Sequence, residues 1–577
     1  MSDAGLPIVR RPADAGEALP ASLHPVLRRV YAARGIRSAE ELELALRHLA
    51  PVGRLANLER AVDVLLAHRD GRITIVGDFD ADGATSTALV LRCLRRFGFA
   101  AVDSLVPNRF DFGYGLTPEI VEVAAQSGPS LLVTVDNGIS SLRGVERARE
   151  LGMEVLVTDH HLPGERLPAA AAIVNPNLPG DPYPSKYLAG VGVAFCVMAA
   201  LGRRLAAQGV AGAGRIAADY LDLVALGTVA DVVPLDRNNR VLVSQGLARI
   251  RAGAAVPGIL ALLQAAGRDP RRAVAGDLAF GVAPRLNAAG RLQDMSTGIE
   301  ALVSDAVAEV RTLAARLSEI NDERRRIEAR MQAEALSALE EIELPAGESG
   351  LPACVSLYDP GWHQGVVGLV ASRVREKVNR PVIAFADAGG GELKGSARSV
   401  PGVHIRDVLA AVAAAAPALI GRFGGHAMAA GLSLPRANLE RFRRLAASRV
   451  AECFPDADFS GTLLTDGELG TADIGLPLAE ALREAGPWGQ AFPEPLFDGV
   501  FGVREARVVG ERHWKLRLSA VDTAGGRPAA VDAIAFNQVD AVTVMPGHRV
   551  HIAYRLDVNE YGGIRRPQLV VESMQRL

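Results

Sequence analysis

The stretch RITIVGDFDADGATSTALVLRCLRRFG, residues 72–98, decides the fold of the first half of the chain. Its apolar start, RITIVGD, predicts a short strand, and GATSTALVLRCLRRFG predicts the helix that follows. Asp78, Asp80 and Asp82 stand at the turn between the two. The stretch is therefore typical of a βα unit that carries carboxylates at the carboxyl end of its strand.

Further units of the same kind follow along the chain. Strands are predicted at AVDSLVP (101–107), SLLVTVDNG (130–138) and EVLVTDHH (154–161), and helices at TPEIVEVAAQSG (117–128) and SSLRGVERARELG (140–152). Strands that alternate with helices of about 10–15 residues form a parallel sheet with helices on both faces. We therefore expect the α/β fold class.

The residue composition and the predicted secondary structure then change twice along the chain. Residues from about 305 to 339 are rich in Ala, Arg and Glu and contain neither Gly nor Pro, which predicts one long helix. A second α/β segment follows, and short β-like runs from about residue 460 predict a small barrel of the OB type. We expect five parts: a helical lead-in over 1–50, a catalytic domain over 51–300, a connecting helix over 301–345, a second α/β domain over 346–455 and an OB-like β-barrel over 456–577.

Composition excludes several classes of protein. The 577-residue chain has 66 acidic and 63 basic residues and a net charge of −3, which excludes a strongly basic coat for nucleic acid but not a local basic groove. Its four cysteines include no CxxC pair, so neither a zinc knuckle nor a disulfide framework is indicated. With no apolar leader and no run long enough to cross a membrane, we expect a cytoplasmic protein without membrane association.

Acidic residues gather after the strands of the predicted sheet. Because the carboxyl ends of strands in an open parallel sheet face one crevice, the acids of three successive units should converge there. A fourth motif, with a single acid in an apolar setting, follows a helical stretch. The set, with two adjoining histidines, comprises Asp78, Asp80, Asp82, Asp136, Asp159, His160, His161 and Asp231.

So many carboxylates in one crevice would repel one another unless they were protonated or neutralised by cations. Oxygen-rich ligation with one or two imidazoles favours manganese or magnesium over structural zinc. Two such ions about 3.5–4 Å apart suit the hydrolysis of a phosphate ester. For any one of these acids, a structural role in a turn or helix cap is the alternative.

Four motifs in this part of the chain resemble those of the DHH phosphoesterase superfamily, which is named for the Asp-His-His found here at 159–161. They are GDFDADGATSTAL (77–89), TVDNGIS (134–140), TDHH (158–161) and GTVADVVPL (227–235). Later matching segments are PNRFDFGYGL (107–116), APRLNAAGRL (283–292), GWHQGVVGLVASR (361–373), KGSARS (394–399) and GRFGGHAMAAGL (421–432). Together they resemble the bacterial single-strand-specific 5′→3′ DNA exonucleases of this superfamily, from about Arg54 to the C-terminal β domain.

The resemblance implies roles for individual residues of the metal centre. Asp80 and Asp82 would be ligands of separate Mn²⁺ or Mg²⁺ ions, and Asp136 would bridge the two ions. His160 and Asp231 would complete the ligand set. Small members of the superfamily have a histidine where this chain has Val76, and Asp78 is then the substitute ligand.

The same resemblance implies two catalytic residues beside the metals. His161 would lie next to the scissile phosphate. Asp159 would orient a neighbouring imidazole without binding metal itself. The segment over 51–300 would be the DHH domain and that over 346–455 the DHH-associated domain, which supplies phosphate contacts.

Contacts with the DNA are expected from both α/β domains. Gly424, Gly425 and His426 resemble a glycine-rich nucleotide-binding loop, in which glycines let backbone N–H groups approach phosphate oxygens. For the two glycines considered alone, a plain turn is the alternative.

Ser396 and Arg398, two apart on a predicted strand, share one face and could hold a terminal phosphate. Arg109 could reach the same phosphate, while Arg285 and Asn287 would contact the strand as it enters. For each of these arginines a surface salt bridge is the alternative.

We therefore expect a metal-dependent exonuclease that hydrolyses single-stranded DNA from its 5′ end in repair and recombination. The implied partners are single-stranded DNA, a single-strand-binding protein and a repair helicase, and the implied state is a monomer. One alternative is a DHH phosphodiesterase of short oligonucleotides or cyclic dinucleotides, which usually has only the two α/β domains. The other is a DNA-binding scaffold without catalysis, which should have lost its metal ligands.

The C-terminal β domain has aromatic residues next to basic ones, among them Phe501, Trp514 and Tyr554. Such residues stack on bases in OB folds that hold single strands. The alternatives are that they form the core of the barrel, or that the domain docks a partner or buttresses the fold through Trp488, Phe492 and Phe497.

Overall fold

In the computed structural model, residues 7–12, 16–107, 115–340, 351–425, 427–455, 457, 459, 461–520, 530–539, 542–561 and 563–577 are described. The chain forms two compact units. The first joins Met1–Ser318 with Leu463–Leu577, and the second is Glu319–Thr462. The predicted barrel therefore belongs to the same unit as the predicted catalytic domain. The five domain boundaries given above stay a prediction.

A five-stranded parallel sheet forms the centre of the first unit, as the sequence predicts. Its strand order is β3-β2-β4-β5-β6. The strands are β2 (Arg72–Gly77), β3 (Ala101–Leu105), β4 (Leu131–Val135), β5 (Glu154–Thr158) and β6 (Ala172–Val174). The three strands that lead into the acidic motifs, β2, β4 and β5, are neighbours, so their carboxyl ends lie side by side.

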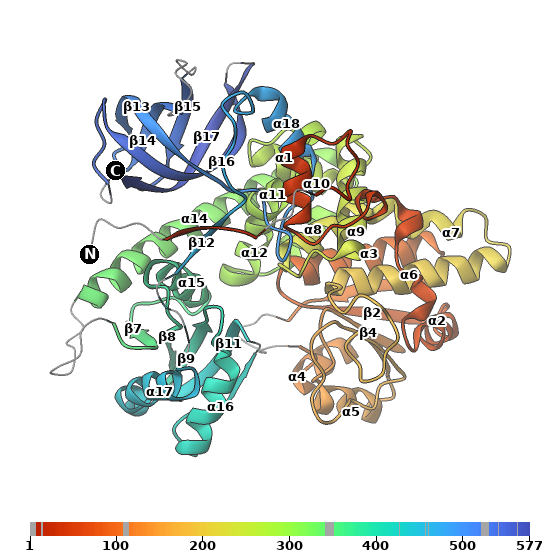
Figure 1. The fold of residues 1–577 in the computed structure, drawn as a ribbon. Helices are drawn as coiled ribbons and strands as arrows, with labels where there is room; N and C mark the ends of the chain where they lie inside the picture. Colours follow the sequence, from red (N-terminus) through yellow and green to blue (C-terminus); the bar gives the residue numbers. More distant parts are fainter. Residues whose placement is uncertain are drawn as a thin grey trace. The chain divides into compact units, whose positions relative to one another are not determined.

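Helices cover both faces of this sheet because side chains alternate along each strand. Ile73 and Ile75 belong to the apolar core with α3 (Ala81–Arg96) and α6 (Gly190–Ala207). Val76 packs in a separate core under α4 (Pro118–Ala125) and α5 (Leu142–Glu150). Figure 1 shows α3 and α6 above the sheet and α4 and α5 below it.

A helical layer extends the first unit beyond α6. Its elements are α2 (Leu58–Ala67), α7 (Ala213–Ile216), α8 (Leu221–Ala230), α9 (Arg237–Arg251), α10 (Pro257–Ala265), α11 (Ala275–Asp277), a π-helix (Leu278–Val282), α12 (Ala283–Leu292) and α13 (Ser296–Val303). By length and composition α6 could cross a membrane, but 72% of it is buried, as in a core helix. The turn before α3 packs tightly on α12, since a Cβ on Gly290 would overlap the Phe79 carbonyl oxygen.

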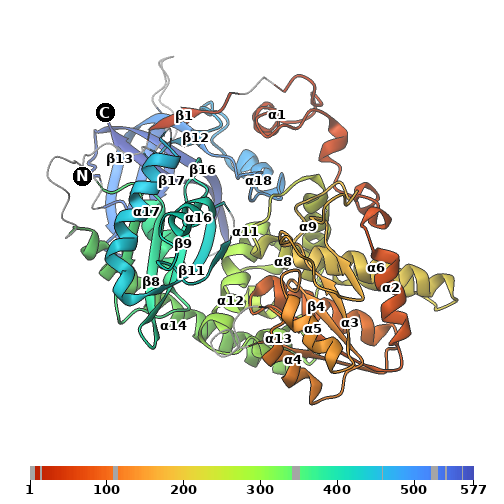
Figure 2. The same ribbon diagram turned by 90° about the horizontal axis from the view of Figure 1, so that it is seen from below.

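The N-terminal lead-in contacts the chain where it returns from the second unit. Strand β1 (Ile8–Arg10) pairs in parallel with β12 (Leu463–Thr465). Tyr31, on α1 (Pro25–Ala32), stacks on Trp488 with ring centroids 6.1 Å apart, and Trp488 stacks on Phe492 at 5.3 Å. Helix α18 (Leu476–Glu484) lies near α1 in both views (Figures 1 and 2). These contacts support the buttress alternative for the aromatic pair.

The predicted barrel is confirmed as a closed sheet in the order β13-β14-β15-β17-β16 (Figure 1). Its strands are β13 (Phe497–Val509), β14 (His513–Ala520), β15 (Val531–Ala535), β16 (Arg549–Tyr561) and β17 (Ile564–Arg576). Phe501, Trp514 and Tyr554 are only 2%, 8% and 1% exposed. All three form core of the first unit, so the alternative of base stacking does not hold for them.

The second unit is the second α/β domain with most of the connecting helix. The predicted long helix is confirmed as α14 (Val307–Glu340). The sheet has the order β10-β11-β9-β8-β7, with α16 and α17 on one face and α15 on the other (Figures 1 and 2). The elements are β7 (Val355–Tyr358), α15 (Val367–Val378), β8 (Val382–Gly389), β9 (Glu392–Arg398), α16 (Ile405–Ala415), β10 (Phe423–Gly425), β11 (Ala429–Pro435) and α17 (Leu439–Cys453).

Candidate metal centre and substrate contacts

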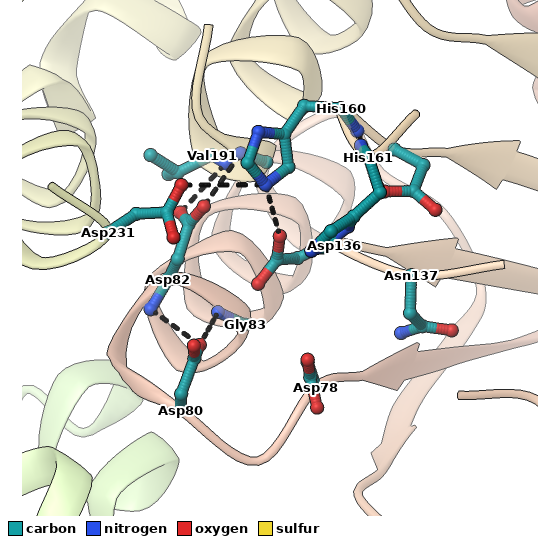
Figure 3. Close-up of polar contacts among 12 residues, drawn as sticks. Asp78, Asp80, Asp82, Gly83, Asp136, Asn137, His160, His161, Val191 and Asp231 are labelled. Atoms are coloured by element: carbon teal, nitrogen blue, oxygen red, sulfur yellow. Dashed lines mark hydrogen bonds and ion pairs between the residues drawn. The ribbon is translucent and has the colours of Figure 1, made fainter. Parts of the chain in front are cut away.

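The acidic motifs converge at the carboxyl ends of β2, β4 and β5. Three groups of side chains hold their ligand atoms within 4.8 Å of one another, which is close enough to share a metal ion. The groups are Asp78 with Asp80 and Asp136, Asp82 with His160 and Asp231, and Asp136 with His160 and His161. The structure thus brings together all six predicted ligands, and Figure 3 shows their side chains facing a common centre.

His160 links the groups at the middle of the site. Its Nε2 atom lies 3.2 Å from Asp136 Oδ1 and 3.4 Å from Asp231 Oδ2. Asp136 Oδ1 is buried and accepts no hydrogen bond from any of the described residues. Carboxylate oxygens with one imidazole are a donor set that suits Mn²⁺ or Mg²⁺. The residues present therefore fit a divalent cation bound between them.

Asp82 is fixed by the first turn of α6. Its carboxylate accepts hydrogen bonds from the backbone N–H groups of Gly190 at 2.7 Å and Val191 at 3.0 Å. A helix N-terminus stabilises negative charge, which offsets part of the cost of burying this group. Burial and the charge of Asp80 nevertheless raise the pKa of Asp82 to about 7.

Gly190 is a site residue that sequence reasoning missed. A Cβ at this position would lie 2.5 Å from Asp136 Oδ1, so only glycine lets α6 approach both Asp82 and Asp136. The signal in the sequence is the Gly-Val-Gly at the start of α6, where no side chain caps the helix.

Asp80 and Asp78 occupy the turn before α3. Asp80 is the N-cap of that helix, and its carboxylate accepts the N–H groups of Asp82 and Gly83, each at 3.0 Å. Asp78 Oδ1 accepts the N–H of Phe79 at 2.7 Å. Val76 is fully buried under α4 and α5 and cannot be a ligand.

Mutual repulsion dominates the electrostatics of the site. Burial and the neighbouring carboxylates, Asp82 first, raise the pKa of Asp136 well above its usual range. The pKa of Asp231 is raised in the same way by burial and by Asp82 and Asp80. Bound cations would remove this repulsion, because each carboxylate would then face positive charge.

Two residues at the site have a backbone conformation that L-residues rarely adopt. Asp136 has φ +62° and Val232, next to Asp231, has φ +60°. Val232 is also 63% exposed. A β-branched residue in the left-handed region is strained, and such strain is typical of functional sites.

Asp159 holds the two histidines of the motif. Its carboxylate accepts the N–H groups of Ile139, His160 and His161 at 2.9, 2.7 and 3.0 Å, and it contacts His161 Nδ1 at 2.7 Å. Burial lowers the pKa of His161, but the contact with Asp159 outweighs it and the net value is about 9. Burial raises the pKa of Asp159, and the hydrogen bond from His161 makes the net shift downward. The structure thus places Asp159 against His161, and its role in orienting an imidazole stays a prediction.

Arg285 and Asn287, on α12, contact the protein itself. Asn287 Oδ1 accepts the N–H of Ala81 at 2.8 Å and so supports the turn that carries the first acids. Arg285 donates to Ser318 Oγ at 2.9 Å, to the Gly281 carbonyl at 2.5 Å and to that of Ala265 at 3.2 Å. Their role as DNA contacts stays a prediction.

In the second unit, Ser396 and Arg398 are neighbours on β9, with Arg398 Nη1 3.0 Å from Ser396 Oγ. Both side chains lie beside the first turn of α15, because a Cβ on Gly368 would be 2.9 Å from each of them. The register of the sheet aligns Ser396 with Gly431 on β11, and Gly431 with Gly424 on β10.

Only one of the two glycines in the predicted loop is required by the backbone conformation and packing of the turn. Gly425 has φ +144°, and a Cβ there would overlap the Ala429 carbonyl oxygen, so the turn itself requires glycine. At Gly424 a Cβ would meet nothing within 4 Å. Gly424 is therefore not required by packing. Arg109 and His426 lie outside the described residues.

Two exposed aromatic residues carried no distinguishing signal in the sequence. Phe280, on the π-helix, is 82% exposed. Phe536, just after β15, is 50% exposed and packs edge-on against His513 at 5.3 Å. Both follow apolar residues in the sequence, and an aromatic residue in such a run is usually part of the core.

Comparison with protein families matches three successive segments of the chain. They are the DHH family, N-terminal domain, over residues 72–228, the DHHA1 domain over 350–452 and the RecJ OB domain over 465–573.

Individual relatives match almost the whole chain. The chain is 52% identical over 572 residues to the single-stranded-DNA-specific exonuclease RecJ of Escherichia coli (strain K12), covering 98% of each protein. It is similar to the crystal structure of RecJ in complex with Mn²⁺ from Thermus thermophilus, with a TM-score of 0.79 and 31% identity over 99% of this chain and 79% of that one. For the same protein with Mg²⁺ the TM-score is 0.74 at 29% identity, over 99% and 78% of the two chains.

Proposed function

Because the chain belongs to the RecJ family of single-stranded-DNA-specific exonucleases, we propose that it hydrolyses phosphodiester bonds of single-stranded DNA from the 5′ end. The observation that carries this function is the convergence of Asp78, Asp80, Asp82, Asp136, His160 and Asp231 on one centre. A scaffold that only bound DNA would have no need for this costly cluster of buried acids.

The chain's own residues define the reaction site. Asp80 and Asp82 would bind separate ions, Asp136 would bridge them, and His160 and Asp231 would complete the set, with Asp78 as a further ligand. Two divalent cations bound there supply an activated water and stabilise charge on the phosphoryl oxygens. His161, held by Asp159 at 2.7 Å, would contact the scissile phosphate.

The proposed 5′ polarity rests on the second unit. Ser396 and Arg398 lie beside the first turn of α15, whose N–H groups favour an anion. A 5′-terminal phosphate bound there would account for a preference for that end of the DNA. Gly424 stands in the same row of the sheet, and its lack of a side chain would let the DNA strand approach the backbone closely.

An assay of labelled oligonucleotides tests the function. Single- and double-stranded oligonucleotides labelled at either end are incubated with Mn²⁺, Mg²⁺ or a chelator. On single strands we expect a 5′ label to enter the smallest product at once and a 3′ label to give a ladder. Cleavage in chelator, or early release of the 3′ label, would contradict the proposal.

The phosphate contact predicts a selective effect of Arg398→Ala. Loss of one charge-assisted contact should weaken use of 5′-phosphorylated ends by about ten- to a hundredfold, or roughly 1.5–3 kcal/mol. Ends with a 5′-hydroxyl should be affected much less, which kcat/KM on the two substrates will measure. Arg443→Ala, which removes an exposed ion pair with Glu440 on α17, is the control and should change neither value. An equal loss on both ends would place Arg398 elsewhere along the strand.

The cellular setting belongs to the same proposal. We place the protein in the cytoplasm, acting as a monomer in DNA repair and recombination with a single-strand-binding protein and a helicase as partners. The alternative of an enzyme for short oligonucleotides or cyclic dinucleotides is disfavoured because the barrel shares one compact unit with the catalytic sheet. Long and short single strands degraded with equal kcat/KM would favour that alternative.

A further inference from the structure

The edge strand β6 leads into two asparagines that contact the histidine motif. Asn175 is fully buried and donates from Nδ2 to the His161 carbonyl at 2.8 Å. Asn177, which is half-buried, donates from Nδ2 to the His160 carbonyl at 2.6 Å. The N–H of Asn177 in turn donates to Asn175 Oδ1 at 2.8 Å, which ties the pair together.

These contacts complete the hydrogen bonding of the histidine backbone. The N–H groups of His160 and His161 both donate to Asp159, and the carbonyls accept from the asparagines. Each histidine thus has both of its backbone polar groups bonded to a side chain. Three side chains therefore hold the backbone from which both imidazole rings project.

Aspartate would not suit the two asparagine positions. A carbonyl oxygen needs a hydrogen-bond donor, which aspartate lacks. A carboxylate there would also add charge near the cluster of buried acids, where repulsion already raises the pKa of Asp136 and Asp231. Pro176 restricts the backbone between the two residues, and its carbonyl accepts a hydrogen bond from Lys186 Nζ at 2.7 Å.

We propose that Asn175 and Asn177 are positioning residues for the metal centre. By holding the carbonyls of His161 and His160, they keep the His160 ring between Asp136 and Asp231, and so set the affinity of the site for a divalent cation. Partners outside the ligand set typically contribute about 10- to 100-fold in metal affinity or activity. This inference rests on the proposed metal-dependent function.

The alternative is that the pair only secures an edge strand. Asn57 provides a matched control for that role, because its Nδ2 donates to the Ile173 carbonyl on β6 at 2.9 Å without touching the histidines. Asn57 has φ +61°, so glycine takes its place without backbone strain. Asn57→Gly therefore removes a hydrogen bond from the same strand and leaves the motif alone.

The test compares Mn²⁺ binding and kinetics in the full-length protein. Mn²⁺ affinity is measured by calorimetry, and the signal of free Mn²⁺ is followed by electron paramagnetic resonance. For Asn177→Ala we expect a Kd for Mn²⁺ about 10- to 100-fold higher and a lower kcat, with KM for single-stranded DNA within about twofold. Asn57→Gly should leave all three values unchanged. Asn177→Gln, which keeps the donor, should retain more affinity than Asn177→Ala.

Two results would overturn the inference in distinguishable ways. If wild type binds Mn²⁺ and Asn177→Ala binds it equally well with unchanged kcat, the asparagines only secure the strand and the proposed function stands. If wild type binds no Mn²⁺, the metal-dependent function itself fails. Should Asn177→Ala not fold, Asn177→Leu, which keeps the branched shape but has no donor, is compared with Asn177→Gln, and a Mn²⁺ affinity of Asn177→Leu equal to that of wild type would reject the inference.

Discussion

Asp136→Asn is expected to lower cleavage of single-stranded DNA by more than about a thousandfold while the protein stays folded. A bridging carboxylate is a ligand of both ions, and each ion contributes several kcal/mol to transition-state stabilisation. Asparagine is the preferred substitution because Asp136 has φ +62°, a conformation that asparagine tolerates and alanine does not. Turnover at saturating Mn²⁺ is the measurement.

The same variant should stabilise the metal-free protein. Asp136 lies among carboxylates whose repulsion raises its pKa, so a neutral side chain removes part of that repulsion. We expect metal-free Asp136→Asn to unfold at the same temperature as wild type or higher, and to gain less stability on addition of Mn²⁺. DNA binding should persist, because less negative charge faces the phosphates. Near-wild-type turnover in Mn²⁺ would exclude Asp136 as a bridging ligand.

Arg34→Ala is expected to destabilise the first unit by about 3–5 kcal/mol, because it removes the hydrogen-bonded counter-charge of the buried Asp466 carboxylate and leaves it the more distant Arg11, at 3.9 Å. The Arg34 and Asp466 side chains are 1% and 0% exposed and are joined by two contacts of 2.8 and 3.0 Å. Arg34 also donates to the Pro493 carbonyl at 2.7 Å and lies over the Trp488 ring at 5.3 Å. Urea unfolding followed by tryptophan fluorescence measures the loss.

An exposed ion pair of the same unit provides the control for this prediction. Arg47 and Glu43 are 69% and 51% exposed, so Arg47→Ala should lower stability by less than about 1 kcal/mol. If the two variants lose stability equally, the buried pair does not hold the lead-in to the returning chain.

The catalytic sheet and its acids could be predicted because each signal is local. An apolar run such as 72–77 reveals a strand by composition, and the acids follow within a few residues. Parallel order then brings Asp78, Asp136 and His160 together without any knowledge of the rest of the fold. The barrel could also be predicted from the sequence, because apolar and polar residues alternate along its strands and clear turns separate them.

Contacts between distant segments could not be predicted in the same way. Gly190 lies 108 residues from Asp82, and although the Gly-Val-Gly at the start of α6 is a visible pattern, it does not identify the carboxylate that it faces. Asn175 and Asn177 look like turn residues beside a proline, although they hold the histidines. Arg285 illustrates the opposite case, since an arginine in a resembling motif does not reveal whether it contacts DNA or the protein's own carbonyls.

Because the chain returns from the second unit to the first, some contacts of the first unit can form only late in synthesis on the ribosome. Arg10, at the end of β1, bonds with Asp498 in the barrel, 488 residues further on. At about 5–20 residues per second, roughly 25 to 100 seconds separate the synthesis of these two partners. Strand β1 therefore cannot form its pairing with β12 until the second unit has been synthesised.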